Sequence, residues 1–444
     1  MNNGGPGYLT NCVPLTVART NWQAAGANNF FLPLIFEGIS TGQCVLTFGF
    51  STNNGPPVAM SRPFYLNLKR VTDLYEHWTM GDSTNMDWHD ISAYPTRTAD
   101  SAIFGKPRTM DDLDYILFVH GWRMQPWERR AFAGEAYKRM WHLGYKGRFA
   151  LYSWPTDYSA LKFWDMTSLA NRQNYDRSEQ RAWKSGMGMF ALLKDLNEIQ
   201  PPLKLRVIAH SMGNVVASEG LRLAGKEFNT PLVQSYIASQ AASVANAYDA
   251  VNPEIRTRTV PPFFYTTPEI YAHFQRNSTN IQPYFAGMKK AVQGTNIVNF
   301  NNLDDYALSS VFAWPGNQDT KPDNNWQCQL VATNSVNTNT GYTYWDTNNT
   351  QLILNGREAY RDQTHEIFSY IAQAESKALG CAEDPTHHIR GEIGGSVNLN
   401  RPPFNFKNNT YEHSAEFNSI NMNRRSYWWQ VLSTFSLTNG LPSL

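Results

Sequence analysis

Hydrophobic and polar positions follow one pattern in the first hundred residues and another pattern after them. Residues 44–50 (CVLTFGF) and 63–69 (PFYLNLK) alternate with a period of two, which is typical of strands, and the turn-rich segment 51–57 joins them. The polar stretch 81–100 follows. We therefore expect an N-terminal β-rich module over residues 1–100.

From residue 101 onward, short apolar strands alternate with amphipathic helices. Strands are expected at residues 115–119, 148–152, 204–208, 235–238 and 296–300. Helices are expected from Pro126 to Gly144, around 183–193, at 212–223, at 358–379 and near 425–429. This rhythm predicts an α/β domain over residues 101–444, with a mostly parallel sheet flanked by helices.

Three segments interrupt the α/β rhythm. Segments 154–182 and 255–290 are rich in aromatic residues, and residues 317–350 are rich in Asn and Thr. We expect the first two to be lid-like excursions, which either form an apolar roof over a site or simply pack against the core. The third segment is typical of a hairpin-like insertion.

Composition excludes several classes of protein. The 444 residues are 42% hydrophobic and only 17% charged, which indicates a folded globular chain. Lys+Arg 38 against Asp+Glu 37 gives a net charge of +1, so no nucleic-acid partner is expected. No apolar run approaches the roughly 20 residues of a membrane span. Sparse charge and abundant Asn, Thr and Trp favour an extracellular or periplasmic location, although the N-terminus has no signal-peptide pattern.

The four cysteines give no metal-binding spacing. Cys12, Cys44, Cys328 and Cys381 form no C-x-x-C pair, so we expect neither a metal site nor a cofactor. Three disulfide pairings and four free thiols are all compatible with the sequence. The oligomeric state stays open.

Ser211 carries the strongest chemical signal. It lies between a short apolar strand and an amphipathic helix, in the sequence AHSMG. Ala209 and Gly213 are small, as the tight strand-to-helix turn of a nucleophile elbow requires. Ser40 matches the bare pattern as well, but no helix follows it, and it is interpreted as a turn serine.

A nucleophilic serine needs a base and a carboxylate, in the chain order serine, acid, histidine. Asp304 and Asp305 follow the strand at 296–300, and one of them is the candidate acid. The histidines after them are His365, His387, His388 and His413. His413 is favoured modestly over His387 and His388, because it lies just ahead of the terminal aromatic helix, while His365 falls inside a helical pattern.

Two backbone N–H groups are expected to form an oxyanion hole. Met212 begins the helix after Ser211, and its N–H points toward the developing oxyanion. The loop after the first α/β strand usually supplies the second donor, for which Trp122 is the candidate. His120 lies outside the required chain order and is interpreted as structural.

Five stretches between residues 110 and 430 resemble the α/β-hydrolase superfamily, close to a poorly characterised group of bacterial esterase- and lipase-like serine hydrolases. They are 118–122 (FVHGW), 175–186 (YDRSEQRAWKSG), 208–222 (IAHSMGNVVASEGLR), 297–308 (IVNFNNLDDYAL) and 412–417 (EHSAEF). The resemblance implies Ser211 as nucleophile, His413 as base, and Asp305 as acid because it immediately precedes Tyr-Ala-Leu.

The function expected from these residues is hydrolysis of a small-molecule or polymeric carboxylic ester through an acyl-enzyme. Amidase or peptidase activity on the same residues is an alternative. A second alternative is a catalytically silent hydrolase fold that serves as a binding or scaffold protein, with the biological role in the N-terminal module.

Overall fold

The structure is a computed structural model of the whole chain, and it divides into two compact units, Met1–Val71 and Thr72–Leu444. It describes residues 42–51, 56–81, 91, 94–98, 110–156, 169–228, 230–243, 248, 295–303, 305, 307–308, 328–332, 346–347, 350–354, 379–381, 393–406, 412–417 and 423–439. Predictions that fall on other residues, including the excursion at 255–290, Ser40 and Cys12, lie outside the described residues.

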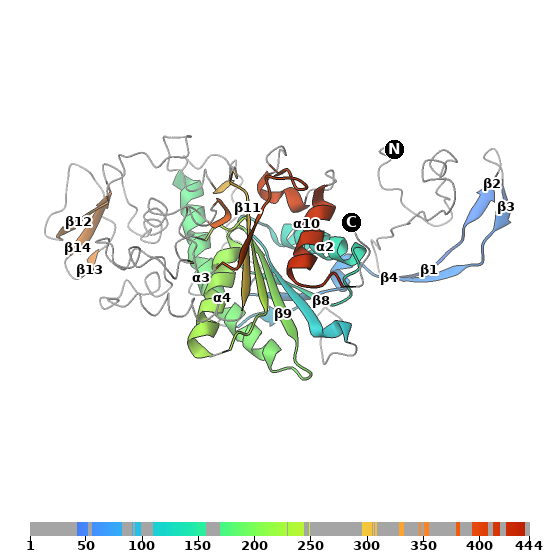
Figure 1. The fold of residues 1–444 in the computed structure, drawn as a ribbon, viewed down its shortest axis with the longest axis horizontal. Helices are drawn as coiled ribbons and strands as arrows, with labels where there is room; N and C mark the ends of the chain where they lie inside the picture. The colour runs from blue at the N-terminus through green and yellow to red at the C-terminus, as the bar shows by residue number, and fades with distance from the viewer. Residues whose placement is uncertain are drawn as a thin grey trace. The chain divides into compact units, whose positions relative to one another are not determined.

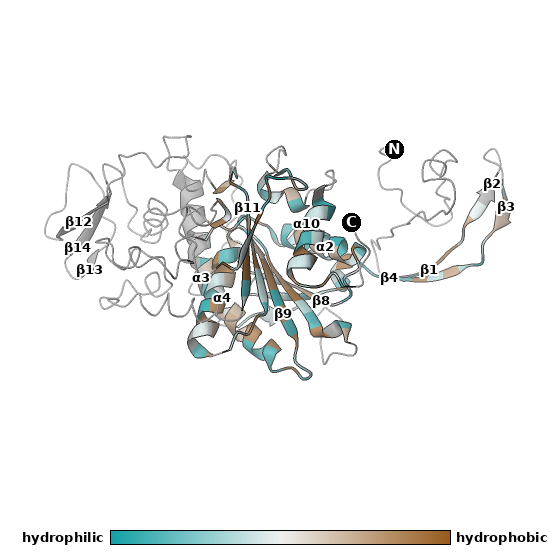
Figure 2. Ribbon diagram, in the orientation of Figure 1, coloured by the Kyte–Doolittle hydropathy of each residue, from teal (hydrophilic) through white to brown (hydrophobic). Residues whose placement is uncertain are grey.

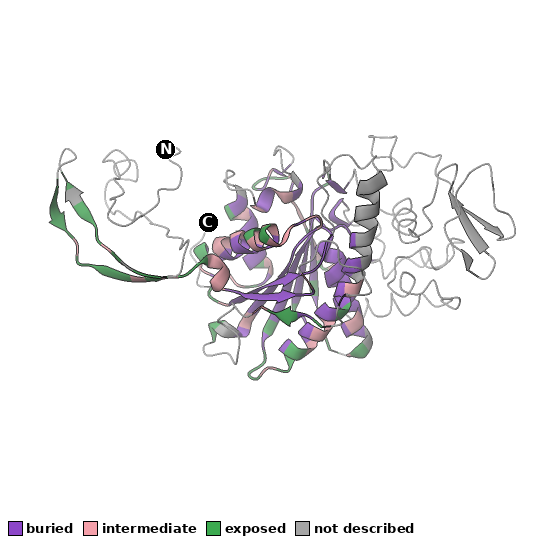
Figure 3. Ribbon diagram, turned by 180° about the vertical axis from the view of Figure 1, so that it is seen from behind, coloured by how far each residue is buried: buried purple, intermediate pink, exposed green. Residues whose placement is uncertain are grey.

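The described part of the first unit consists of antiparallel strand pairs. Strand β1 (Gly42–Leu46) pairs with β4 (Phe64–Leu68), and β2 (Gly49–Ser51) pairs with β3 (Pro57–Met60). The predicted strand at 44–50 is thus two short strands. Figure 3 shows that exposed residues predominate along these strands. The unit ends at Val71, earlier than the boundary predicted at residue 100.

The earlier boundary follows from two strands that join the main sheet. Strand β5 (Glu76–Thr79) pairs in parallel with β8, and β6 (Thr96–Arg97) pairs antiparallel with β5. Strand β5 is fully buried although its sequence, EHWT, is polar. Its charged residue can be buried because the Glu76 carboxylate accepts a hydrogen bond from Arg148 Nε at 3.0 Å. A pattern based on hydrophobic residues therefore does not predict this strand, whose buried charge is paired with an arginine.

Eight strands form the main sheet of the second unit in the order β15-β11-β10-β9-β7-β8-β5-β6 (Figure 1). Its remaining strands are β7 (Asp114–Val119), β8 (Arg148–Ser153), β9 (Lys204–His210), β10 (Ser235–Ser239), β11 (Asn296–Asn301) and β15 (Gly395–Asn398). Every neighbouring pair is parallel except β5 with β6. The predicted mostly parallel α/β sheet is confirmed.

Helices cover both faces of this sheet. Helices α2 (Pro126–His142) and α10 (Asn423–Thr434) lie on one face, and α3 (Leu169–Asn197) and α4 (Gly213–Glu227) lie on the other (Figure 1). Strand β7 lies between β8 and β9, so the chain reverses its direction across the sheet after β8. Right-handed crossovers in opposite directions place α2 and α3 on opposite faces. The predicted excursion at 154–182 is shorter than expected, because α3 begins at Leu169.

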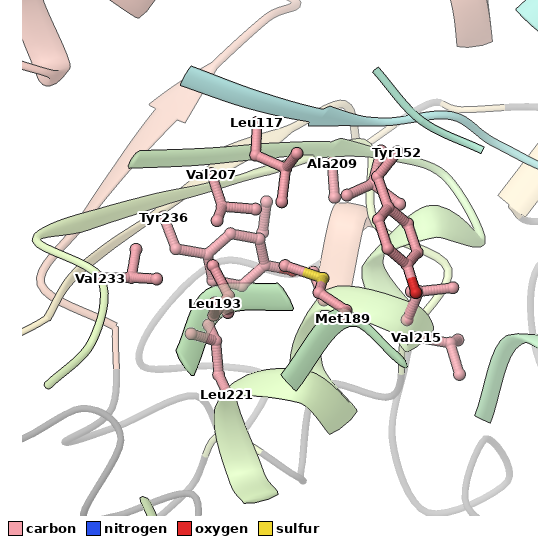
Figure 4. Packing of buried hydrophobic residues seen from close by; sticks show 14 of the residues in the cluster. Leu117, Tyr152, Met189, Leu193, Val207, Ala209, Val215, Leu221, Val233 and Tyr236 are labelled. Atoms are coloured by element: carbon pink, nitrogen blue, oxygen red, sulfur yellow. The ribbon is translucent and has the colours of Figure 1, made fainter. Parts of the chain in front are cut away.

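Side chains of the central strands alternate between the two faces. Leu117 and Val207 pack with Met189 of α3 in one buried cluster (Figure 4). Phe118, next to Leu117, stacks on Phe149 with ring centroids 6.3 Å apart. Figure 2 shows apolar residues concentrated on these strands. Burial of both faces explains the continuous apolar runs seen in the sequence.

Helix α2 begins and ends where the sequence predicts. Pro126 occupies its first turn, and Gln125 N–H donates to Glu128 Oε2 at 2.7 Å as part of a capping box. The helix ends at His142, and Gly144 follows with φ 105°, a conformation that glycine adopts readily.

The segment between β11 and β15 contains a further described sheet. Strand β14 (Thr350–Leu354) pairs antiparallel with β12 (Cys328–Ala332) and with β13 (Asp346–Thr347). Of the helix predicted at 358–379, only Leu379 is described, at the start of the 3-10 turn η6 (Leu379–Cys381). Cys381 is a buried thiol. Among the helices that the structure describes, none has the length and apolar character of a membrane span.

Replacing Met189 by alanine should destabilise the second unit. The side chain is 0% exposed between the sheet and α4, so its removal leaves a cavity and should lower the free energy of unfolding by about 2–5 kcal/mol. Met110, which is 75% exposed, provides the matched control Met110→Ala, expected within about 0.5 kcal/mol of the wild type. Denaturant titration measures both, and equal losses would contradict the packing described here.

Candidate active site

Ser211 lies in a tight turn between β9 and α4. Its φ is 54°, a left-handed conformation that is uncommon for any residue other than glycine. A Cβ on Gly213 would lie 2.4 Å from the carbonyl oxygen of His120, and one on Gly121 would lie 3.1 Å from the Cβ of Ser211. The turn after β9 and the loop after β7 therefore approach so closely that Gly213 has no room for a side chain, while Gly121 has room for one only if its neighbours shift.

Asn214 holds this turn in place. Its Nδ2 lies within hydrogen-bonding distance of the carbonyl oxygens of Ala209, Ser211 and Ser239, at 3.1, 2.8 and 3.2 Å. Its Oδ1 accepts a hydrogen bond from the hydroxyl of Tyr236 at 2.6 Å. The backbone N–H of Ser211 also donates to Ser239, at 3.1 Å. The left-handed turn is thus fixed to β10.

The structure brings together Ser211, His413 and Asp305. His413 Nε2 lies 2.8 Å from Ser211 Oγ, and His413 Nδ1 lies 2.6 Å from Asp305 Oδ2. The histidine is in the 3-10 segment η8 (Glu412–Phe417), and the aspartate is in the loop after β11. All three side chains are buried or nearly so.

Two backbone N–H groups orient the carboxylate of Asp305. Its Oδ1 accepts hydrogen bonds from Ala307 N and Leu308 N at 2.9 and 3.1 Å. Its own N–H donates to the carbonyl of Asn302 at 3.0 Å. With Oδ1 engaged by the backbone, Oδ2 is left to accept the hydrogen bond from His413. Asp304 lies outside the described residues.

Opposing influences act on His413. Burial, the largest of them, disfavours its charged form, but the adjacent carboxylate of Asp305, its hydrogen bond and the charge of Glu416 together raise the pKa of His413 above its ordinary value of 6.5. A buried imidazole that gains a proton beside a carboxylate has the properties of a general base.

The other histidines near the sheet play different parts. His120 is fully buried and stacks on Trp154, and its Nε2 accepts a hydrogen bond from Trp154 N at 3.0 Å. Burial lowers the pKa of His120 well below its usual value. These packing and hydrogen-bond contacts agree with its interpretation as structural. His365, His387 and His388 lie outside the described residues.

Both predicted oxyanion donors belong to backbone that adjoins Ser211. Met212 follows it directly and is the N-cap of α4, where helix N–H groups carry partial positive charge. Trp122 follows Gly121, which packs against the Ser211 side chain. Within the described residues, no group of three or more His, Cys, Asp or Glu side chains is arranged to hold a metal ion.

Sequence reasoning missed three polar residues around His413, namely His210, Gln240 and Glu416. His210 Nε2 and Gln240 Nε2 lie 2.6 and 3.0 Å from the carbonyl oxygen of His413. Gln240 Nε2 also donates to Glu416 Oε2 at 3.0 Å. The only available signals were their positions: His210 precedes the serine, Gln240 follows a strand, and Glu416 lies within the EHSAEF stretch.

Residues 98–247 match the model of a family described as "Alpha/beta hydrolase of unknown function (DUF900)". The match covers the β7 exit and the turn at Ser211 and ends before Asp305 and His413. Together with the mostly parallel sheet, the match shows an α/β-hydrolase fold, as the resemblance implied. None of the curated proteins compared with the chain matches it.

Replacing Gly213 by alanine should destabilise the protein. The added Cβ would meet the carbonyl oxygens of His120 and Val119 at 2.4 and 2.8 Å, which forces α4 away from the β7 exit. Overpacking of this kind costs about 1–3 kcal/mol. At Gly395 a Cβ meets nothing within 4 Å, so Gly395→Ala is the matched control. Thermal or chemical unfolding compares the two, and a Gly213→Ala protein as stable as the control would contradict the close approach.

Proposed function

We propose that the protein is a serine hydrolase that cleaves carboxylic esters, with Ser211 as nucleophile, His413 as general base and acid, and Asp305 as the orienting carboxylate. The observation that carries the proposal is the continuous hydrogen-bonded chain from Ser211 Oγ to His413 at 2.8 Å and from His413 to Asp305 at 2.6 Å. A neutral imidazole between a hydroxyl and a carboxylate is the arrangement that activates a serine.

The proposed reaction has two acyl-transfer steps. Ser211 Oγ attacks the ester carbonyl while His413 Nε2 takes the hydroxyl proton, and the tetrahedral intermediate collapses as His413 returns that proton to the leaving alcohol. A water molecule then attacks the acyl-enzyme with His413 again as base, and the acid leaves as Ser211 recovers its proton. Asp305 keeps Nδ1 protonated, so that Nε2 is the nitrogen that exchanges protons.

The N–H groups of Met212 and Trp122 are the proposed donors to the oxyanion. Removing one donor of this kind typically costs about 3–4 kcal/mol of transition-state stabilisation, so two donors are a large part of the catalysis. The glycine-dependent packing of Gly121 against Ser211 supports this assignment, because it holds the backbone before Trp122 beside the reacting hydroxyl.

The proposed substrates are esters with apolar acyl or aromatic groups. The aromatic residues of the sequence ahead of α3, between 157 and 168, and of segment 255–290 suggest an apolar environment for the substrate. Trp122, half-buried beside the turn at Ser211, is a further aromatic surface close to the site. A hydrolysis panel across acyl chain lengths tests this preference directly.

Ser211→Ala should abolish ester hydrolysis. Loss of the nucleophile removes the acyl-enzyme route, so kcat on p-nitrophenyl esters should fall by at least about 10³-fold. Ser433→Ala, on the exposed side of α10, is the matched control and should behave as the wild type. If the Ser211→Ala protein is as active as the wild type, or if neither protein acts on any ester of the panel, the proposed function is wrong.

The pH profile should report His413. Only the neutral imidazole accepts the serine proton, so kcat/KM should fall as the pH drops through a midpoint above 6.5, in line with the raised pKa. Asp305→Asn removes two of the influences that raise it, so the midpoint should move to lower pH while kcat falls by up to about 10⁴-fold. Asp304→Asn is the charge-matched control. The assignment moves by one residue if Asp304→Asn, rather than Asp305→Asn, has these effects.

A further inference from the structure

Gln240 has an unusual backbone for a residue with a long side chain. It directly follows β10, is fully buried and has φ 42°, in the left-handed region that favours glycine. Such conformations cost free energy and persist only where the surrounding structure imposes them, often at functional sites. Gln240 N donates to the carbonyl of Phe300 at 2.9 Å, which ties this turn to β11.

The side chain of Gln240 joins the segments that carry Asp305 and His413. Its Nε2 donates to the carbonyl oxygen of His413 at 3.0 Å and to Glu416 Oε2 at 3.0 Å. Its Oε1 accepts a hydrogen bond from Asn302 Nδ2 at 3.2 Å, and the carbonyl of Asn302 in turn accepts the N–H of Asp305. One amide thus fixes the spacing between the aspartate and the histidine.

His210 binds the same carbonyl group. Its Nε2 lies 2.6 Å from the carbonyl oxygen of His413, so Nε2 carries the proton and donates. Its Nδ1 has no hydrogen-bond partner within the described part of the chain. Burial and the nearby His413 lower the pKa of His210 to about 3, which keeps the ring neutral over the working pH range. His210 is therefore a donor that does not compete with His413 for protons.

Glu416 completes the network from within η8. Its side chain is fully buried, and Oε1 accepts a hydrogen bond from Ser239 Oγ at 3.2 Å. The groups that face it are His210 at 3.6 Å, Gln240, Ser239 with its partner Tyr427, and the charges of His413 and Arg424. Burial raises the pKa of Glu416 to about 7.

We propose that Gln240, together with His210, is a positioning residue that holds the main chain of His413 so that the imidazole stays aligned with both Ser211 and Asp305. This inference rests on the proposed function. His413 must meet the serine hydroxyl, the leaving alcohol and the attacking water in turn, so its ring has to return to one place in every step. A displacement of about 1 Å at a reacting group can cost about 100-fold in rate.

The chemistry of the amide explains why glutamine suits this position. It must donate toward both the His413 carbonyl and Glu416 and also accept from Asn302, and a side-chain amide supplies two N–H donors together with an acceptor oxygen, whereas a hydroxyl or a neutral imidazole has only one donor. Gln240→Met keeps the length of the side chain but loses these hydrogen bonds. Gln430→Met, on α10 where Gln430 bonds only Thr434 in the described part of the chain, is the matched control.

Two measurements on the full chain test the proposal. In steady-state kinetics on a p-nitrophenyl ester, Gln240→Met should lower kcat by about 10- to 100-fold with KM nearly unchanged, whereas Gln430→Met should match the wild type. In proton NMR, the downfield signal of the His413 Nδ1–H should be present in the wild type, absent in Asp305→Asn and weakened or shifted in Gln240→Met. A substitution that only lowered stability would leave this signal unchanged in the folded protein.

A second pair of variants tests the same proposal in case the Gln240→Met protein does not fold. His210→Phe removes the other donor and should give the same kinetic pattern, while His210→Gln restores an N–H donor and should recover most of the lost kcat. Wild-type kcat and an unchanged NMR signal in both Gln240→Met and His210→Phe would overturn the positioning role. An inert wild type would count against the ester-hydrolase proposal instead, because the NMR comparison does not depend on turnover.

Discussion

The close approach between the N-terminus of α4 and the exit of β7 is the constraint on which the site depends. Gly213 packs against the carbonyl oxygens of Val119 and His120, and Gly121 packs against Ser211. Because a side chain at Gly213 would collide with these carbonyl groups and one at Gly121 would be tightly crowded, the segments can approach closely only with glycine or little more at these positions, and Ser211 lies in the sharp turn after β9 with φ 54°. The same contact brings the backbone before Trp122 beside the serine, so one packing requirement exposes the hydroxyl to its partners and gathers the proposed oxyanion donors.

Two buried carboxylates lie near one histidine and receive different environments. Asp305 has one oxygen held by two backbone N–H groups and the other directed at His413 Nδ1. Glu416 accepts its side-chain hydrogen bonds from the neutral residues Ser239 and Gln240, and burial outweighs the nearby charge of His413 and raises the pKa of Glu416 to about 7. Distinct surroundings therefore assign distinct parts to chemically similar groups, as in other sites where paired acids divide their tasks. In the proposed mechanism Asp305 orients the imidazole itself, and Glu416 belongs to the network proposed to hold the backbone of His413.

Sequence patterns predicted those helices, strands and turns whose positions depend on neighbouring residues in the chain. Pro126, Gly144 and the apolar runs predicted the limits of α2 and the central strands. The elbow pointed to Ser211, chain order left Asp304 and Asp305 as candidate acids, and only the family resemblance favoured Asp305. Strands β5 and β15 were not predicted. The sequence of β5, EHWT, contains a charged residue that is paired inside the protein, and the sequence of β15, GSVN, has little apolar character. The roles of the Gln240 and His210 side chains could not be predicted either, because their hydrogen-bond partners are more than sixty positions away in the sequence.

The long interval between Asp305 and His413 does not hinder their meeting, and the sheet explains why. Strands β11 and β15 are parallel neighbours, with Val298 opposite Gly395, so the chain leaves the sheet after β11 and returns beside it. The entropy of closing a loop rises only slowly with its length, so a large segment can be accommodated between neighbouring strands. What the site requires is that the exits of β9, β10, β11 and β15 lie at one edge. Parallel pairing places these strand ends at the same edge of the sheet. Gln240, at the end of β10, forms hydrogen bonds there with the segments that carry Asp305 and His413.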